Sequence, residues 1–253
     1  MARRDIDPFE IGRRGFTITF REFPIWLACA VFPFAAAVLV ALARRQSIEV
    51  SPWIVEPARW IADAIFDWCW MTALCRSTTL QLLTFPATRG FWLFLILLAG
   101  LDAAWWVYSN ALGIIGFAAI TGGVLLIDLE GPLVQVAGII LLVLMLQLGI
   151  WAGLRLMIWP AHCAATGKLV WPRTIWRSMQ DHSFDMLIIA AITIGPLLLF
   201  AGGQLLALRG GAEAALIGST PMLIADLILS VFTRGAFDAA ALVAYFGIFT
   251  RAN

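Results

Sequence analysis

The sequence has 253 residues, of which 62% are hydrophobic and only 13% are charged, and its formal net charge is +1. A soluble domain is usually about 45–50% apolar and about 25% charged, so this composition indicates an integral membrane protein. The nearly neutral charge, with no basic block outside the predicted loops, argues against a nucleic-acid-binding protein. Apolar segments run from end to end, which favours a single membrane domain over residues 1–253.

Residues 1–22 are predicted to form an interfacial segment at the N-terminus. Phenylalanine and isoleucine alternate with arginine between Phe9 and Arg21, a pattern typical of an amphipathic helix at the level of the lipid headgroups. The period-two alternation from Phe16 to Phe20 also fits an extended piece. Acidic residues are mixed in, and the following apolar run is too long for a signal peptide, so no cleavable signal is expected.

Six membrane spans are predicted, at about 23–43, 60–83, 91–127, 132–159, 184–208 and 221–249. Apart from 60–83, each provides about 20 apolar residues or more, the length needed to cross the hydrocarbon core. The segment 60–83 carries Asp63 and Asp67 one turn apart, so it is either a span with a polar face turned into the bundle or a helix lying partly in the interface, and the span is favoured. Residues 46–59 are expected to be a polar linker, and the stretch from Arg155 to Ser178 a loop. The tract 91–127 is long for one span, so it is expected to be broken near Asn110 and Gly113, as one interrupted helix or as two short spans.

The distribution of lysine and arginine predicts the orientation. Six spans with cytoplasmic N- and C-termini place on the cytoplasmic side Arg3, Arg4, Arg13, Arg14, Arg21, Arg76, Arg89, Arg155, Lys168, Arg173, Arg177 and Arg251. The opposite side then holds only Arg44, Arg45, Arg59 and Arg209. Seven spans would spoil this asymmetry, so the positive-inside rule favours six. The residues that decide the choice, and that are predicted to be topology anchors, are Arg155, Lys168, Arg173 and Arg177.

Ionisable residues inside the predicted spans form the main candidate site, because such groups are costly in a membrane unless they are paired or hydrated. The candidate polar network consists of Asp63, Asp67, Asp102, Asp226, Arg234 and Asp238. Arg234 and Asp238 are spaced to pair along one helix face. Asp63 and Asp67 cannot neutralise each other and need a partner: Arg76, Arg234, a water-filled cavity or another subunit. The network is either a pathway for an ion or small substrate, or a set of structural pairs and interfacial residues. The second interpretation is favoured.

Other patterns are less specific. Gly149 and Gly153 have the GxxxG spacing that allows close helix packing, within this chain or in a dimer, and packing within the chain is favoured. His162 and His182 could meet as ligands, and Asp128 and Glu130 could act as an acid and a base, but a solvated turn fits the latter pair better. The four cysteines lack metal-ligand spacing and are expected to be buried. No catalytic signature, metal site or cofactor site is predicted.

Four segments carry a resemblance to known proteins: PFEIGRRGFTITF at 8–20, RLMIWPA at 155–161, IWRSMQDHSF at 175–184 and ALVAYFGIF at 241–249. Together they resemble a group of poorly characterised bacterial six-helix membrane proteins. That group is related to the membrane domain attached to some glycerophosphoryl diester phosphodiesterases. The resemblance covers most of the chain and implies a six-helix architecture. The acidic second span departs from it, and no phosphodiesterase domain is expected, so that activity is not carried over.

The function expected from the sequence is therefore non-enzymatic. The chain is expected to be an accessory or scaffolding subunit of a membrane protein complex, in the bacterial cytoplasmic (inner) membrane. Its expected partners are membrane lipids and other membrane protein subunits, without a cofactor. A transporter or channel lined by the intramembrane acids is the alternative. A lipid-processing enzyme using His162 or His182 at the cytoplasmic face is a weaker one.

Overall fold

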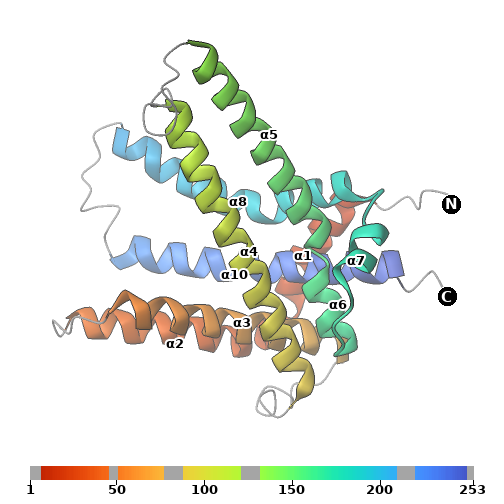
Figure 1. Cartoon of the computed structure of the whole chain (residues 1–253). Coiled ribbons are helices and arrows are strands. Elements are labelled where there is room, and N and C mark those ends of the chain that lie inside the picture. The colour runs from red at the N-terminus through yellow and green to blue at the C-terminus, as the bar shows by residue number, and fades with distance from the viewer. Residues whose placement is uncertain (1–6, 46–50, 77–87, 121–131, 210–219, 250–253) are drawn as a thin grey trace.

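The computed structural model describes residues 7–45, 51–76, 88–120, 132–209 and 220–249, and every regular element in these ranges is a helix (Figure 1). The expected all-α fold is confirmed. The helices are α1 (Pro8–Arg21), α2 (Phe23–Arg45), α3 (Pro52–Arg76), α4 (Arg89–Ile120), α5 (Pro132–Leu156), α6 (Trp159–Thr166), α7 (Pro172–Ser178), α8 (Ser183–Arg209) and α10 (Thr220–Phe249).

Five stretches are long and apolar enough to cross a membrane, which is the pattern of a multi-pass membrane protein. They are Phe23–Ala43 in α2, Arg89–Phe117 in α4, Val136–Thr166 over α5 and α6, Ser183–Ala207 in α8 and Pro221–Phe249 in α10. All five fall on predicted spans. The helix at the sixth predicted position, α3, is not among them. It carries Glu56, Arg59, Asp63 and Asp67, more charge than a lipid-facing span tolerates.

The interfacial segment is helical, not extended. Asp7 begins α1 as its N-cap, accepting hydrogen bonds from the backbone N–H groups of Phe9 at 3.0 Å and Glu10 at 3.2 Å. One face of α1 is buried against α8 and α10 rather than facing lipid alone. The approach is close because a Cβ at Gly15 would overlap the carbonyl oxygen of Ala236 on α10. The segment is therefore part of the helical body.

Two predicted boundaries are wrong. The helix expected from residue 60 begins at Pro52, so the predicted linker is helical over 52–59. Proline fits the first turn of a helix, where its missing N–H is not needed. The break expected near Asn110 and Gly113 is absent, because α4 continues through both residues. The amide of Asn110 is satisfied within the helix, donating to the Trp106 carbonyl at 2.7 Å. Residues 77–83 and 121–127 of these spans lie outside the described residues.

The expected loop between Arg155 and Ser178 contains two short helices, α6 and α7. Prolines lie in the first turn of each, so Pro160 and Pro172 start helices rather than end them. Gly167 ends α6 in a left-handed conformation, with φ of 66°. These helices place the end of α6 beside the start of α4, because a Cβ at Gly90 would lie 3.2 Å from the Gly167 Cα.

The core is built around α10, which packs against α1, α3, α6 and α8. In the 18-residue apolar window of α10, 56% of the residues are buried, against 6% in the corresponding window within Val136–Thr166. Gly235 allows a close approach of α2 and α3: the Trp70 indole of α3 donates to its carbonyl at 2.8 Å, and a Cβ there would overlap the Trp26 ring of α2. The contact of α3 with α10 brings the charged residues of the two helices together.

Candidate functional site

Asp63 and Asp67 lie one turn apart on α3, and Arg234 and Asp238 lie one turn apart on α10. Arg234 donates to Asp67 through two nitrogens: Nε to Oδ1 and Nη2 to Oδ2, both at 2.6 Å. Its Nη1 lies 2.9 Å from Oδ2 of Asp63. One guanidinium therefore bridges both acids of α3 in the fork geometry that favours arginine over lysine.

Arg234 is one of the partners expected for Asp63 and Asp67, and it pairs with both, whereas its expected ion pair with Asp238 is not formed. Arg234 forms its ion pairs with α3, across the helix interface, and not with Asp238 on its own helix. The side chain of Asp67 is only 7% exposed, so its charge depends on this partner, whereas those of Asp63 and Arg234 are 39% and 38% exposed. A buried carboxylate with both oxygens bound to one guanidinium is a well-satisfied pair.

Asp238 is the residue of this cluster that has a buried oxygen without a hydrogen-bond partner. The residue is 4% exposed, and its Oδ2 is buried without a hydrogen-bond partner. Its carboxyl group lies within reach of a side-chain hydrogen bond to that of Asp67 when one of the two is protonated, and it interacts electrostatically with Asp67 and Arg234. Buried polar atoms nearly always have a partner, so an exception in a cluster of charges indicates a site for something that the protein chain does not supply.

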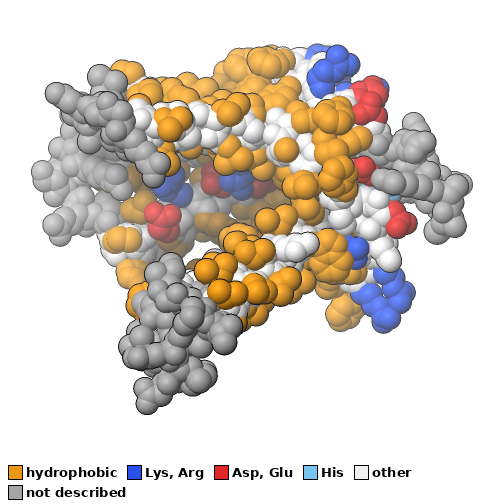
Figure 2. Space-filling model, turned by 90° about the horizontal axis from the view of Figure 1, so that it is seen from above, with side chains coloured by type: hydrophobic (Ala, Val, Ile, Leu, Met, Phe, Trp, Pro, Cys, Tyr) orange, Lys and Arg blue, Asp and Glu red, His pale blue; other side chains and the backbone are white. Residues whose placement is uncertain are grey.

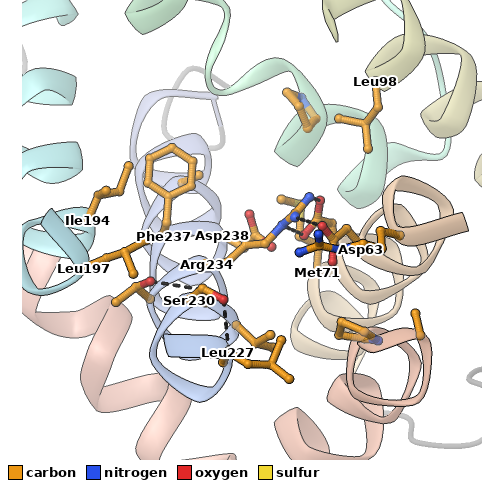
Figure 3. A pocket seen from close by; sticks show the side chains of 18 of the residues that line it. Asp63, Met71, Leu98, Ile194, Leu197, Leu227, Ser230, Arg234, Phe237 and Asp238 are labelled. Atoms are coloured by element: carbon orange, nitrogen blue, oxygen red, sulfur yellow. Dashed lines mark hydrogen bonds and ion pairs between the residues drawn. The ribbon is translucent and has the colours of Figure 1, made fainter. Parts of the chain in front are cut away.

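These residues line a cavity of about 500 Å³ between α2, α3, α8 and α10, closed in part by α4 and α6. Figure 3 shows Arg234 reaching from α10 toward Asp63 on α3, while Phe237 lies on the side of α10 that faces Ile194 and Leu197 of α8. Figure 2 shows acidic and basic side chains at the floor of a hollow with hydrophobic walls. The remaining lining residues are Pro33, Ala36, Ala37, Arg59, Asp67, Met71, Leu98, Met157, Pro160, Leu227, Ser230, Val231, Thr233, Asp238 and Ala241.

The cavity has an excess of acid. Three carboxylates line it (Asp63, Asp67 and Asp238), against the guanidinium groups of Arg234 and Arg59. Arg59 is exposed, and its sequence position in the predicted linker gave no reason to place it here. With all groups ionised, the cavity is negative, and a mostly apolar wall strengthens the attraction for a cation.

The other two acids of the candidate network lie elsewhere. Asp102 on α4 is exposed and accepts a hydrogen bond from the Trp60 indole of α3, beside a separate groove. Asp226 on α10 is half-buried and does not line the cavity. The structure thus brings together four of the six predicted residues.

The two glycines of the GxxxG pattern have different surroundings. A Cβ at Gly149 would overlap the ring of Tyr108 on α4, whose hydroxyl donates to the Met145 carbonyl. Gly149 therefore allows α4 and α5 to pack inside this chain. Gly153 is exposed, and a Cβ there would meet no atom within 4 Å among the described residues.

The four predicted topology anchors differ in their exposure. Lys168, Arg173 and Arg177 are exposed, but Arg155 is only 8% exposed. Its guanidinium lies 4.0 Å from the Trp151 ring centroid and 5.0 Å from that of Trp176. It also donates to the Ser183 hydroxyl at 3.2 Å and the Gln180 carbonyl at 3.4 Å. Arg155 therefore holds α5 against α7 and the start of α8. The spacing of four residues between Trp151 and Arg155 is compatible with their contact on one helix face, whereas counting charges does not reveal this role.

The two histidines have separate partners. His182 Nδ1 lies 3.0 Å from Oδ2 of Asp185, an i,i+3 pair in which both residues are buried. His162 packs against the rings of Tyr245 and Phe249 on α10. Among the described residues, no group of three His, Cys, Asp or Glu side chains could hold a metal ion.

Cys29, Cys69 and Cys163 are buried and Cys75 is half-buried, and none of them forms a disulfide among the described residues. Their expected character as small apolar residues fits these positions. Asp128 and Glu130 lie outside the described residues.

In comparisons with family models, with curated proteins and with solved structures, nothing matches this chain. The resemblance to six-helix bacterial membrane proteins thus gains no support from these comparisons. Arguments about function rest on the cavity and its charges.

Proposed function

We propose that the chain is a transporter that carries a small cationic solute across the membrane through the central cavity. The observation that carries the proposal is the convergence of Asp63, Asp67 and Asp238 on one cavity between membrane helices, with Arg234 paired to the first two. Ionisable groups inside a membrane domain are costly and commonly mark solute or ion pathways. Among the expectations from the sequence, the geometry supports the polar pathway best.

The proposal includes the topology: six spans with both termini in the cytoplasm, in a bacterial inner membrane. Charge on α3 excludes a lipid-facing span but suits one whose acids are covered by α10. Exposed basic residues support the orientation, because α1, α7 and the end of α10 lie on one side of the molecule (Figure 1). That side carries Arg13, Arg14, Arg21, Arg173 and Arg177.

A flux assay in proteoliposomes tests transport. Protein-containing and empty liposomes are loaded with a pH-sensitive dye, and external benzyltrimethylammonium or choline is added with and without an imposed pH gradient. Transport predicts cation uptake that Asp63→Asn and Asp67→Asn each reduce at least about tenfold, while Asp102→Asn, outside the cavity, leaves it unchanged. Equal uptake by empty liposomes, or by the cavity variants, would contradict the proposal.

The scaffolding function remains a second candidate because of the α4–α5 hairpin. In the 18-residue apolar window within Val136–Thr166 only 6% of the residues are buried, and exposed residues of α5 include Ile139, Leu144 and Trp151. Helices of a partner subunit could pack on this surface. Extraction in a mild detergent and native mass measurement tests it: a second protein species lost on Leu144→Asn supports a scaffold, and a monomer with bound lipid only speaks against one.

A further inference from the structure

Building on the proposed transport function, we infer that the cavity binds an organic monocation through the carboxylate of Asp238. We further infer that Asp238 holds a proton while the cavity is empty. Binding then exchanges one positive charge for another: the O–H bond of the carboxyl group breaks, the proton leaves to water, and the carboxylate pairs with the ammonium group.

Of the three acids that line the cavity, Asp238 is the one available to pair with a cationic ligand. Both oxygens of Asp67 are bound by Arg234, and one oxygen of Asp63 is held by the same guanidinium. Arg234 has no further ion pair with Asp238. Asp238 is thus the cavity acid without a cation of its own, and its Oδ2 is a buried acceptor without a donor.

Several other buried polar side chains of the protein have hydrogen-bond partners within their own helices. The buried hydroxyls of Thr72, Thr193 and Thr233 donate to carbonyls one turn earlier in their own helices, at 2.6, 2.8 and 2.8 Å. Four buried side-chain nitrogen or oxygen atoms of the described residues lack a partner, and Asp238 Oδ2 is the carboxyl oxygen among them. An unpaired carboxylate costs far more to bury than an indole or imidazole nitrogen, so neutralisation by a proton is the expected resting state.

The charged residues that face Asp238 come from α3 and α10. On α3 these are Asp67, with Asp63 and Arg59 along the same cavity wall, and on α10 the neighbour is Arg234. The lining residues from α2, α4, α6 and α8 carry no charge. The charged residues of α1 do not line the cavity, and on α8 the acid Asp185 is paired with His182. Arg234 also acts electrostatically on Asp238, but with all three acids ionised the described cavity lining has three negative charges against the two positive charges of Arg59 and Arg234. An incoming cation would balance this excess.

The size and the lining of the cavity indicate the chemical class of the ligand. A volume of about 500 Å³ exceeds that of a bare metal ion, and most of the wall is aliphatic or aromatic, including Phe237 and Met71. Cavities of roughly 300–1,000 Å³ with apolar walls and a few polar groups accept small organic molecules. Phe237 adds a ring face for a cation. An amine or quaternary ammonium compound with an apolar body matches these features better than a hydrated inorganic ion.

Isothermal titration of the purified full-length protein with benzyltrimethylammonium tests the inference. This probe is permanently charged, so any proton released comes from the protein. Titrations in two buffers of different ionisation enthalpy give the number of protons released, which is expected to be about one per cation. The neutral isostere neopentylbenzene is expected to bind at least about tenfold more weakly, since it lacks the charge.

Asp238→Asn keeps the size of the side chain but cannot ionise, so it is expected to weaken binding at least about tenfold and abolish proton release. Asp226→Asn, on the same helix outside the cavity, is the matched control and is expected to bind as the native protein does. Unfolding temperatures of both variants show whether each is folded. Binding of the native protein without proton release, equal affinity in Asp238→Asn, or no binding at millimolar probe would overturn the inference.

The two proposals fail separately. Binding with proton release but no flux in proteoliposomes would reject transport and leave the binding site standing. Flux that is insensitive to Asp238→Asn would reject this inference and leave transport standing. Proton competition gives a further check: the affinity of the native protein is expected to fall as pH is lowered, while the residual affinity of Asp238→Asn does not change.

Discussion

Arg234 of α10 and Asp67 of α3 form a bidentate ion pair, with both nitrogen–oxygen distances at 2.6 Å, across the contact between these two helices. The pair links two segments separated by most of the chain. It also positions the remaining two acids, since the same guanidinium contacts Asp63 and lies next to Asp238. Its effect on stability is therefore measurable apart from any transport.

Arg234→Met is expected to destabilise the protein by about 3 kcal/mol, because it leaves Asp67 buried without a counter-ion. This corresponds to a fall in unfolding temperature of roughly 6–12 °C for a chain of this size. Thermal unfolding in a fixed detergent measures it. The double variant Asp67→Asn with Arg234→Met is expected to be more stable than Arg234→Met alone, and an unchanged unfolding temperature in Arg234→Met would contradict the role of the pair.

Whether α3 crosses the membrane can be decided by labelling two engineered cysteines. If α3 spans, Ser51 before α3 and Arg173 on α7 lie on opposite sides of the membrane. If α3 does not span, they lie on the same side. Both positions are exposed, whereas Cys29, Cys69 and Cys163 are buried.

We expect a membrane-impermeant maleimide to label Arg173→Cys only in inverted vesicles and Ser51→Cys only in right-side-out ones. The parent protein in each vesicle type controls for labelling of the native cysteines, including half-buried Cys75. Labelling of both engineered positions in the same type of vesicle would rule out six spans.

Docking of α1 depends on the small volume of Gly15. Gly15→Val is expected to destabilise the protein by about 1–3 kcal/mol, because its side chain would collide with the Ala236 carbonyl of α10. Release of α1 would also make Arg13 and Arg14 faster sites for trypsin. Gly100→Val on α4 is the matched control, since a Cβ there meets nothing within 4 Å of the described residues. Equal trypsin rates in native protein and Gly15→Val would refute this docking.

Arg155 is expected to act through packing and not through charge alone. Arg155→Leu should destabilise the protein by about 2 kcal/mol, since it removes two aromatic contacts and two charge-assisted hydrogen bonds. Arg155→Lys should be intermediate, because lysine lacks the planar fork that lies over the Trp151 ring. Arg173→Leu, at an exposed position, should change the unfolding temperature little. Equal effects of Arg155→Leu and Arg173→Leu in thermal unfolding would show that Arg155 is an anchor only by charge.

The sequence predicted the membrane character and four of the cavity residues for a physical reason: charge is so costly in a bilayer that its positions stand out. It misplaced the start of α3, because proline and glutamate around residues 52–57 read as a linker although proline also fits a first helical turn. The pairing of Arg234 with α3 rather than Asp238 depends on how α3 packs on α10. The spacing of residues within one helix does not predict a contact between two helices far apart in the sequence. The cavity, with Arg59 on its wall, results from the same packing.

The two glycines of α5 separate packing inside the chain from association between chains. Gly149→Val is expected to destabilise the α4–α5 hairpin by about 1–3 kcal/mol, since its side chain would overlap the Tyr108 ring. Gly153→Val meets no described atom, so its unfolding temperature should match that of the native protein. Native mass measurement of both variants gives the second readout. If Gly153→Val also leaves the native mass unchanged, the GxxxG spacing serves packing within the chain; loss of a higher oligomer in that variant alone would show that Gly153 faces a second copy.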